Sequence, residues 1–411
     1  MKQLFILFLS LPFVCLAQEK GIHFEHGNSW EEVLAKAKAE NKYIFMDCFT
    51  TWCGPCRYMT NTVFPQEKVG DYFNANFINV KVQLDTTASD NEEIKKWYAD
   101  ANDIKVDYKI QAFPTFLFFA PDGRLVHRMT GGGEAEQFIQ RASNALDPAK
   151  QYYTLLKKFE DGERAPEMLK QIGYAALGAF DREKAREISN AYLRTQKNLF
   201  TNENIQFLQD FTISNQDTGF TIFLKYPEKI NVVLGRGKAE SKVNHIIFMY
   251  EAQPKLFSNT KTVENSTWEK LNEQFIEEYG DKAPEILAYT KATYCLYKKD
   301  WVNYQTSVAE YVNKYSDKIA SEDLNEYAWG VFQNCKDDAC LRQALDWSKQ
   351  TFKDKDIAMY IDTYANLLYK LGKKEEAIEW QKKALAAAGN NRDKYAETLK
   401  KMEGGVKTWN D

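Results

Sequence analysis

Two cysteines separated by two residues, Cys53 and Cys56, are the side chains best suited to chemistry in this chain. A pair at this spacing can close a small disulfide ring and reopen it, which indicates a redox pair rather than a structural bridge. Gly54 and Pro55 between them suit the first turn of a helix, where a proline N–H is not needed. Because the free N–H groups at a helix start stabilise a thiolate, we predict that Cys53 is the nucleophile and Cys56 the resolving thiol.

A metal site is the alternative use of such a pair. Zinc would require two further ligands, and the chain has only four histidines. His23 and His26 lie three residues apart, a spacing that would suit a metal only on a helix. No nucleotide-binding glycine motif or flavin fingerprint accompanies the cysteines. We therefore predict neither a metal nor another cofactor.

Apolar runs alternate with helix-like stretches on both sides of the cysteine pair. Residues 43–49 form a continuous apolar run with one acid, as in a strand that is covered on both faces, and residues 77–82 are predicted to be a second buried strand. Residues 115–119, the turn Pro121-Asp122-Gly123 and residues 125–129 have the pattern of a β-hairpin. The helix-like stretches begin near residues 29, 53, 92 and 134. The first has Ser29 or Asn28 as its N-cap, and Glu32 completes a capping-box pattern with Ser29. This order predicts an α/β unit whose sheet has helices on both faces.

Residues 27–146 resemble the thioredoxin family. Trp52-Cys53-Gly54-Pro55-Cys56 matches the family's redox motif in full, and Phe113-Pro114-Thr115 matches its cis-proline loop. The resemblance implies a thioredoxin-like fold, in which helices flank a central mixed sheet. It also implies that the chain is a thiol–disulfide oxidoreductase.

The resemblance further implies a role for each residue around the cysteine pair. Asp47 falls where the family keeps a buried acid that relays a proton to and from the second cysteine, Cys56. A carboxyl group inside an apolar strand has a raised pKa, as a proton acceptor near neutral pH requires. Pro114 would lie beside the disulfide and act with these residues in catalysis. The residues implied to contact an extended substrate chain are Trp52, Gly54, Pro55, Phe113 and Thr115.

The other cysteines suggest packing or a structural bridge. Cys335 and Cys340 enclose four residues, and in an oxidising compartment we predict a local disulfide between them, with a second redox pair as the alternative. Cys48 follows Asp47 and points to the opposite face of the strand, where we expect a buried, inert thiol. Cys295 falls on the small-residue face of its helix, so we expect it in the core.

The N-terminus has the pattern of a signal peptide. A basic start precedes an apolar stretch at residues 4–16, and the polarity changes abruptly after Ala17. We predict a cleaved signal peptide at residues 1–17, because the stretch falls short of the roughly 20 apolar residues of a membrane anchor. Cys15 raises a lipoprotein alternative, which the bulky residues before it disfavour. The mature protein is then expected outside the membrane in an oxidising compartment, most simply a bacterial periplasm.

The chain changes character at Asp147-Pro148, because proline disfavours a helical conformation in the residue before it. Residues 150–403 are almost wholly helical in pattern. We therefore predict a thioredoxin-like domain at residues 18–146 and an all-helical domain at residues 147–411.

One stretch of the helical domain, residues 364–385, resembles a tetratricopeptide repeat. It has small residues where the two helices of such a repeat pack closely, namely Ala365, Gly372, Ala377 and Ala384. It departs from the pattern at Gln381, where an aromatic residue is usual. We predict an array of helical hairpins with degenerate repeats.

The formal net charge of −4 and the lack of a dense Lys/Arg tract argue against a nucleic-acid partner. We predict an exported thiol–disulfide oxidoreductase that reduces or exchanges disulfides of client proteins, with the helical domain binding a client or partner. Because the chain encodes no electron source, an upstream membrane electron donor or acceptor is implied. The alternatives are a disulfide oxidant or isomerase, and a repeat-based interaction protein whose thioredoxin domain is a redox sensor.

Overall fold

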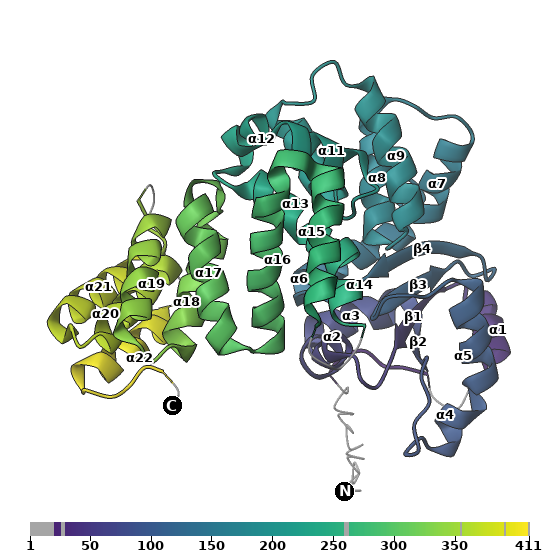
Figure 1. Ribbon diagram of the computed structural model, residues 1–411. Helices are drawn as coiled ribbons and strands as arrows, with labels where there is room; N and C mark the ends of the chain where they lie inside the picture. Colours follow the sequence, from purple (N-terminus) through teal and green to yellow (C-terminus); the bar gives the residue numbers. More distant parts are fainter. Residues whose placement is uncertain (1–19, 26–28, 259–262, 354–355, 390–391, 410–411) are drawn as a thin grey trace, which may run out of the picture. The chain divides into compact units, whose positions relative to one another are not determined.

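The computed structural model describes residues 20–25, 29–258, 263–353, 356–389 and 392–409 (Figure 1). The predicted signal peptide at residues 1–17 lies outside the described residues, as does His26. The chain divides into two compact units, one that ends at Gln196 and one that begins at Lys197. Within the described ranges, no helix has both the length and the apolar character needed to cross a membrane.

The sheet of the first unit is mixed, and the strand that precedes the cysteine pair lies inside it. Its order is β2-β1-β3-β4, with β1 at Tyr43–Phe49, β2 at Phe77–Gln83, β3 at Thr115–Phe119 and β4 at Leu125–Thr130. β1 runs parallel to β2 and antiparallel to β3, and β3 runs antiparallel to β4. The predicted fold class, a mixed sheet flanked by helices and followed by an all-helical region, is confirmed (Figure 1).

Helices precede, connect and follow these strands in the first unit. Those between the N-terminus and β4 are α1 (Trp30–Glu40), α2 (Gly54–Tyr58), the π-helical turn η1 (Met59–Val63), α3 (Glu67–Asn76), α4 (Glu92–Lys96) and α5 (Tyr98–Asp107). Those after β4 are α6 (Ala135–Ser143), η2 (Asn144–Leu146), α7 (Tyr152–Glu160), α8 (Pro166–Gly178) and α9 (Arg182–Thr195).

The side chains of β1 alternate between two apolar clusters, one on each face of the sheet. Phe45 packs with Phe73 of α3 and Phe138 of α6 on one face. Ile44 and Met46 belong to the cluster on the other face, to which α1 and α5 contribute. Burial on both faces is the reason that this strand reads as a continuous apolar run.

The helix predicted before β1 and the helix predicted after β2 differ in how clearly the sequence marks their bounds. α1 begins with the predicted capping box, since Glu32 N–H donates to Ser29 Oγ and Ser29 N–H donates to Glu32 Oε2. The helix predicted around residues 92–98 is in fact α4 followed by α5, which continues to Asp107. In α5 only Ala101 and Ile104 are buried, so it lacks the wide apolar face by which such a helix is predicted.

Two helices beyond residue 147 pack with the sheet of the first unit. α7 and α8 contact the edge strand β4. The Tyr152 N–H at the start of α7 donates to His127 Nδ1 of β4 at 3.0 Å, and Thr130 Oγ1 donates to the Gly178 carbonyl at the end of α8. Tyr152 Oη also donates to the Asp181 carboxylate, which caps α9. These helices therefore cover a strand edge that would otherwise be open to other chains.

The second unit is helical throughout its described residues. Its first helices are α10 (Asn202–Phe211), α11 (Thr218–Lys225), α12 (Pro227–Leu234), α13 (Lys238–Ile247), η3 (Phe248–Ala252), α14 (Gln253–Leu256) and α15 (Asn265–Tyr279). The rest are η4 (Gly280–Lys282), α16 (Ala283–Lys298), α17 (Trp301–Tyr315), η5 (Ser316–Lys318), α18 (Ser321–Asn334), α19 (Asp338–Thr351), α20 (Ala358–Lys370), α21 (Lys374–Ala387) and α22 (Arg392–Glu403). Consecutive helices pair, most extensively α16 with α17, α18 with α19 and α20 with α21 (Figure 1).

The α20–α21 pair occupies the stretch that resembles a tetratricopeptide repeat. Ala365, Ala377 and Ala384 are fully buried, and Gly372 takes a φ of +79° in the turn. Gln381, which replaces the usual aromatic residue, is also fully buried, and its Nε2 donates to Asp362 Oδ1 at 2.7 Å. The side-chain amide of Gln381 is therefore hydrogen-bonded at the position where the repeat pattern has an aromatic ring. Assignment of the whole region to that repeat family stays a prediction.

The buried His127 is expected to lower the stability of the first unit in acid. Burial, with a smaller effect of the Arg141 charge, lowers the pKa of His127 from 6.5 to about 4. Between these values the unfolded chain binds the proton and the folded chain does not, so the free energy of unfolding falls as the pH drops from 6.5 to about 4. We expect a loss of about 3 kcal/mol from this residue, measured by urea unfolding at several pH values. His127→Gln should flatten that slope, while His23→Gln, at an exposed position, should not; equal slopes in all three proteins would contradict the prediction.

Candidate active site

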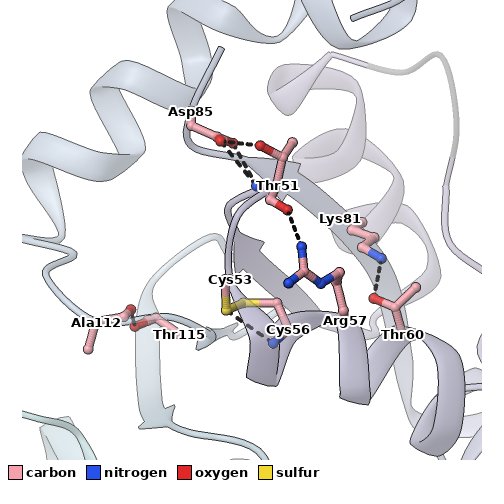
Figure 2. Close-up of a disulfide and its surroundings, with 9 residues drawn as sticks. All are labelled: Thr51, Cys53, Cys56, Arg57, Thr60, Lys81, Asp85, Ala112 and Thr115. Carbon is pink, nitrogen blue, oxygen red and sulfur yellow. Dashed lines mark hydrogen bonds between the residues drawn. A yellow bond between two sulfur atoms is a disulfide. The ribbon is translucent and has the colours of Figure 1, made fainter. Parts of the chain in front are cut away.

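Cys53 and Cys56 form a disulfide at the start of α2, with their Cα atoms 5.3 Å apart (Figure 2). Cys53 is the N-cap of the helix, and the Cys56 N–H donates to Cys53 Sγ at 3.0 Å. Each cysteine is only 3% exposed. A thiolate at Cys53 would therefore have a main-chain N–H and the positive end of a helix dipole beside it, as the sequence predicts.

The local sequence explains why the helix begins at this point. β1 ends at Phe49, and a turn at residues 50–52 leads to α2. Pro55 lies in the first helical turn, where its fixed φ suits the helix and its missing N–H has no partner to lose. Gly54 and Pro55 are both exposed, which is compatible with their predicted contact with a substrate chain.

Asp47 is a buried carboxyl group in β1, directly opposite Lys81 of β2. Burial raises the pKa of Asp47 from 3.8 to about 7, against a smaller lowering by the Lys81 charge. Its Oδ1 has no hydrogen-bond partner within the described part of the chain. Strand alternation places Asp47 on the face of Phe45, where Met59 packs just beyond Cys56. The carboxyl group can thus exchange a proton near neutral pH on the side of the sheet that carries the disulfide.

The predicted cis-proline loop is present, since the peptide bond between Phe113 and Pro114 is cis. The ring of Phe113 meets that of Trp52 edge-on, with 5.7 Å between their centroids. Trp52 is 66% exposed, so this pair presents an aromatic surface next to the disulfide. Such a surface suits the apolar side chains of an extended client segment.

Thr115, which was predicted to contact the substrate, is fully buried. Its Oγ1 donates to the Ala112 carbonyl at 2.7 Å (Figure 2). The side chain therefore closes the loop that carries Pro114 and does not reach the surface. The sequence resemblance placed the residue in the correct loop, but its direction depends on the pleat of β3.

Residues 30–145 match the family of thioredoxin-like domains. A thioredoxin-like protein of Synechocystis is 34% identical over 100 residues, which cover 24% of this chain and 78% of that protein. The chain belongs to the thioredoxin family.

The thioredoxin domain has relatives in plants and in bacteria. Thioredoxin Y of rice chloroplasts is 35% identical over 124 residues, which cover 30% of this chain and 61% of the relative. The thiol:disulfide interchange protein DsbD of Pseudomonas fluorescens is 30% identical over 111 residues, which cover 26% of this chain and 17% of DsbD. The chain thus spans less than two thirds of either relative. Together with the bonded cysteine pair, these likenesses support a thiol–disulfide oxidoreductase.

The thioredoxin site also contains residues that we did not predict. The Asp85 carboxylate accepts the main-chain N–H of Thr51 at 3.0 Å and its hydroxyl, and Arg57 Nη1 donates to the Thr51 carbonyl at 3.3 Å (Figure 2). These contacts fix the turn that carries Trp52. A signal was available, because Asp85 follows a buried strand and the carboxyl ends of parallel strands meet at one edge of a sheet.

Lys81 is a second residue that sequence reasoning missed. Its Nζ donates to Thr60 Oγ1 of η1 at 2.7 Å (Figure 2). Because η1 continues α2, this bond links β2 to the redox helix, the name used here for α2 and η1 together. Burial lowers the pKa of Lys81, and the Asp47 charge opposes that effect. The available signal was a single lysine inside an apolar run, since a buried cation needs a nearby partner.

The predicted disulfide between Cys335 and Cys340 is not formed in the structure, where both are free thiols. Cys335 is fully buried at the end of α18, and its Sγ accepts the Asp337 N–H at 3.3 Å. The Asp337 carboxylate caps α19 and accepts the Cys340 N–H. Hydrogen bonds therefore already close this turn. Burial raises the pKa of the Cys340 thiol, which disfavours the thiolate that disulfide formation requires.

Cys48 and Cys295 are also free and buried. Cys48 faces the cluster on the opposite side of the sheet from Asp47, and burial is the main cause that raises the pKa of its thiol. Cys295 lies in α16, with its Sγ 3.9 Å from Ser307 Oγ. Both positions agree with the expected packing roles.

Asp47 should destabilise the oxidised protein at alkaline pH. Its pKa is about 7 in the folded chain and 3.8 in the reference state, so the folded chain binds the extra proton between these values. The free energy of unfolding therefore falls as the pH rises from about 4 to 7. Asp47→Asn removes this cost, and we expect it to raise the free energy of unfolding by about 4 kcal/mol at pH 8 and by little at pH 4. Asp71→Asn, at an exposed carboxyl group of α3, is the control for urea unfolding; a gain that does not depend on pH would refute the assignment.

Proposed function

We propose that this protein is an exported thiol–disulfide oxidoreductase that reduces or exchanges disulfides of client proteins. The observation that carries the proposal is the Cys53–Cys56 disulfide at a helix start, in a domain that also holds the buried Asp47 and the cis peptide before Pro114. The partial likeness to a thiol:disulfide interchange protein supports exchange chemistry. The signal-peptide pattern at residues 1–17 is the support for export.

The reduced pair would act in two steps. The Cys53 thiolate attacks one sulfur of a client disulfide, breaks that S–S bond and forms a mixed disulfide, and the second client sulfur leaves as a thiolate. Cys56 then gives its proton to the Asp47 carboxylate and attacks Cys53 Sγ. This step releases the first client sulfur as a thiolate and closes the Cys53–Cys56 disulfide. The client thus gains two electrons and takes two protons from solvent. The Cys53–Cys56 pair is left oxidised.

The oxidised pair must be reduced again before the next cycle. The chain carries no nucleotide- or flavin-binding motif that could supply electrons. We therefore propose an upstream dithiol donor at the membrane. The Gly54-Pro55 dipeptide, which resembles that of reducing thioredoxins, favours this direction over oxidation.

The helical part of the second unit is proposed to bind a client or partner. Stacked helix pairs such as α16–α17, α18–α19 and α20–α21 form extended surfaces in repeat proteins. Exposed apolar side chains are available in this unit at Val232, Ile276, Val302 and Met359. Contact with clients here would raise their concentration near the disulfide without adding chemistry.

Trapping of a client is the direct test of the nucleophile. Reduced Cys56→Ser cannot resolve the mixed disulfide, so with insulin as the client we expect an adduct on non-reducing gels that dithiothreitol releases. Cys53→Ser should form no adduct and reduce no insulin. Cys48→Ser, a matched control at a buried thiol, should behave like the unaltered protein. If Cys53→Ser retains activity, the catalytic role fails and an interaction protein becomes the better description.

The reduction potential of the Cys53–Cys56 pair decides the direction of electron flow. We expect a value near that of thioredoxin, about −270 mV, on equilibration of the full chain with dithiothreitol or glutathione buffers. Mass spectrometry after alkylation of the two cysteines gives the reduced fraction. A value of about −120 to −180 mV would instead make the protein an oxidant or isomerase.

A further inference from the structure

A glycine loop that follows β4, residues 131–133, lies between the cis-proline and the redox helix. The Gly131 N–H donates to the Pro114 carbonyl at 2.9 Å, and Gly131 has a φ of +77° that favours glycine. A Cβ atom on Gly132 would lie 3.1 Å from Met59 Sδ and 4.0 Å from the Pro55 carbonyl. The main chain of the loop thus packs closely against the cis-proline loop and against the helix that carries the disulfide, α2 with its continuation η1.

Arg141 of α6 binds this loop with its guanidinium group. Its Nη1 donates to the carbonyls of Gly131 and Gly132 at 3.3 and 3.4 Å, and its Nη2 donates to the carbonyl of Thr130. In a planar trans peptide the C=O and the following N–H point in opposite directions. The peptide group between Thr130 and Gly131 therefore connects Arg141 on one side to Pro114 on the other. Hydrogen bonds in such a chain polarise and strengthen one another.

Hydrogen bonds to these carbonyls stabilise the charge of the Arg141 guanidinium group. The residue is partly buried and lines a cavity of about 320 Å³, and none of the described residues that line this cavity is acidic. The described residues also include no ion pair with Arg141. A cation removed from water without a counter-ion is costly unless its donors are hydrogen-bonded. Displacement of the loop would remove its three carbonyl acceptors, so the charge and the loop hold each other in place.

We propose that Arg141 is a positioning residue of the redox site. It fixes the peptide groups of the glycine loop against Pro114 and Pro55. In this proposal the loop contacts the client chain beside the disulfide. The proposal rests on the proposed function as a thiol–disulfide oxidoreductase. Arg141 touches neither sulfur nor client; it acts through the loop.

Arg141→Gln in the full chain tests this role. A loop that contacts the client equally in the ground and transition states affects KM and not kcat. With a disulfide-bonded peptide as the client, we expect KM to rise about tenfold, the effect of losing charge-assisted hydrogen bonds, with kcat within about twofold of its original value. Arg141→Lys keeps the charge but loses the planar guanidinium group. Its KM should therefore lie between that of the unaltered protein and that of Arg141→Gln.

Arg164→Gln is the matched control. Arg164 also donates to main-chain carbonyls of the first unit, those of Phe159 and Glu163, but in the turn between α7 and α8. Its loss should leave KM unchanged. If Arg164→Gln and Arg141→Gln raise KM equally, or if neither raises it, the positioning role is overturned. If Arg141→Gln does not fold, Arg141→Lys provides the same comparison.

Amide exchange of Gly131 separates failure of this proposal from failure of the proposed function. Release of the peptide group between Thr130 and Gly131 should speed exchange of the Gly131 N–H in Arg141→Gln and leave it unchanged in Arg164→Gln. If the unaltered protein reduces no peptide disulfide, the proposed function fails, whereas faster exchange still supports the role of Arg141 in the loop. Unchanged exchange in Arg141→Gln overturns the positioning role whatever the activity.

Discussion

The redox site depends on the register of β1. This strand has β2 on one side and β3 on the other, and apolar clusters cover both of its faces. A slip by one residue would exchange Asp47 and Cys48 between the two faces, and would move the start of α2 relative to the sheet. With the register fixed by packing, the Cys53 sulfur lies at the N-terminus of α2 and the Asp47 carboxyl group lies within the apolar layer of the sheet. The electrostatics of both groups follow from that placement.

Burial of apolar side chains does not hold the loops in position, because loops bury little apolar surface. In this protein a polar side chain fixes each loop around the disulfide, and for two of the three loops it comes from a distant segment of the chain. Asp85 binds the turn at Thr51, the Thr115 hydroxyl closes the cis-proline loop, and Arg141 binds the carbonyls of the glycine loop. The packed sheet positions these side chains, and they in turn position the main chain that surrounds the sulfur atoms.

The strands and the reactive pair could be predicted because their signals are local. Apolar runs identified β1 and β2, and a hairpin pattern identified β3 and β4. The spacing and intervening residues of Cys53 and Cys56 identified a redox pair at a helix start. The disulfide expected between Cys335 and Cys340 used a local signal too. It failed as a description of this structure because Asp337 closes the same turn through hydrogen bonds. Closeness in sequence shows that two thiols can come together. It does not show which hydrogen bonds already hold the turn between them.

The sequence by itself was enough to predict the fold class of the first unit and the pairing of Cys53 with Cys56, since both depend on residue type and short spacing. The resemblance to thioredoxins added the acid at Asp47, which the structure places in the buried part of β1. Tertiary structure alone decided that Lys81 lies opposite that acid, that Arg141 binds the glycine loop, and that His127 joins β4 to α7. These contacts join segments far apart in the chain. No periodicity or motif encodes such pairs, because strand register and helix packing bring them together only when the apolar faces are buried.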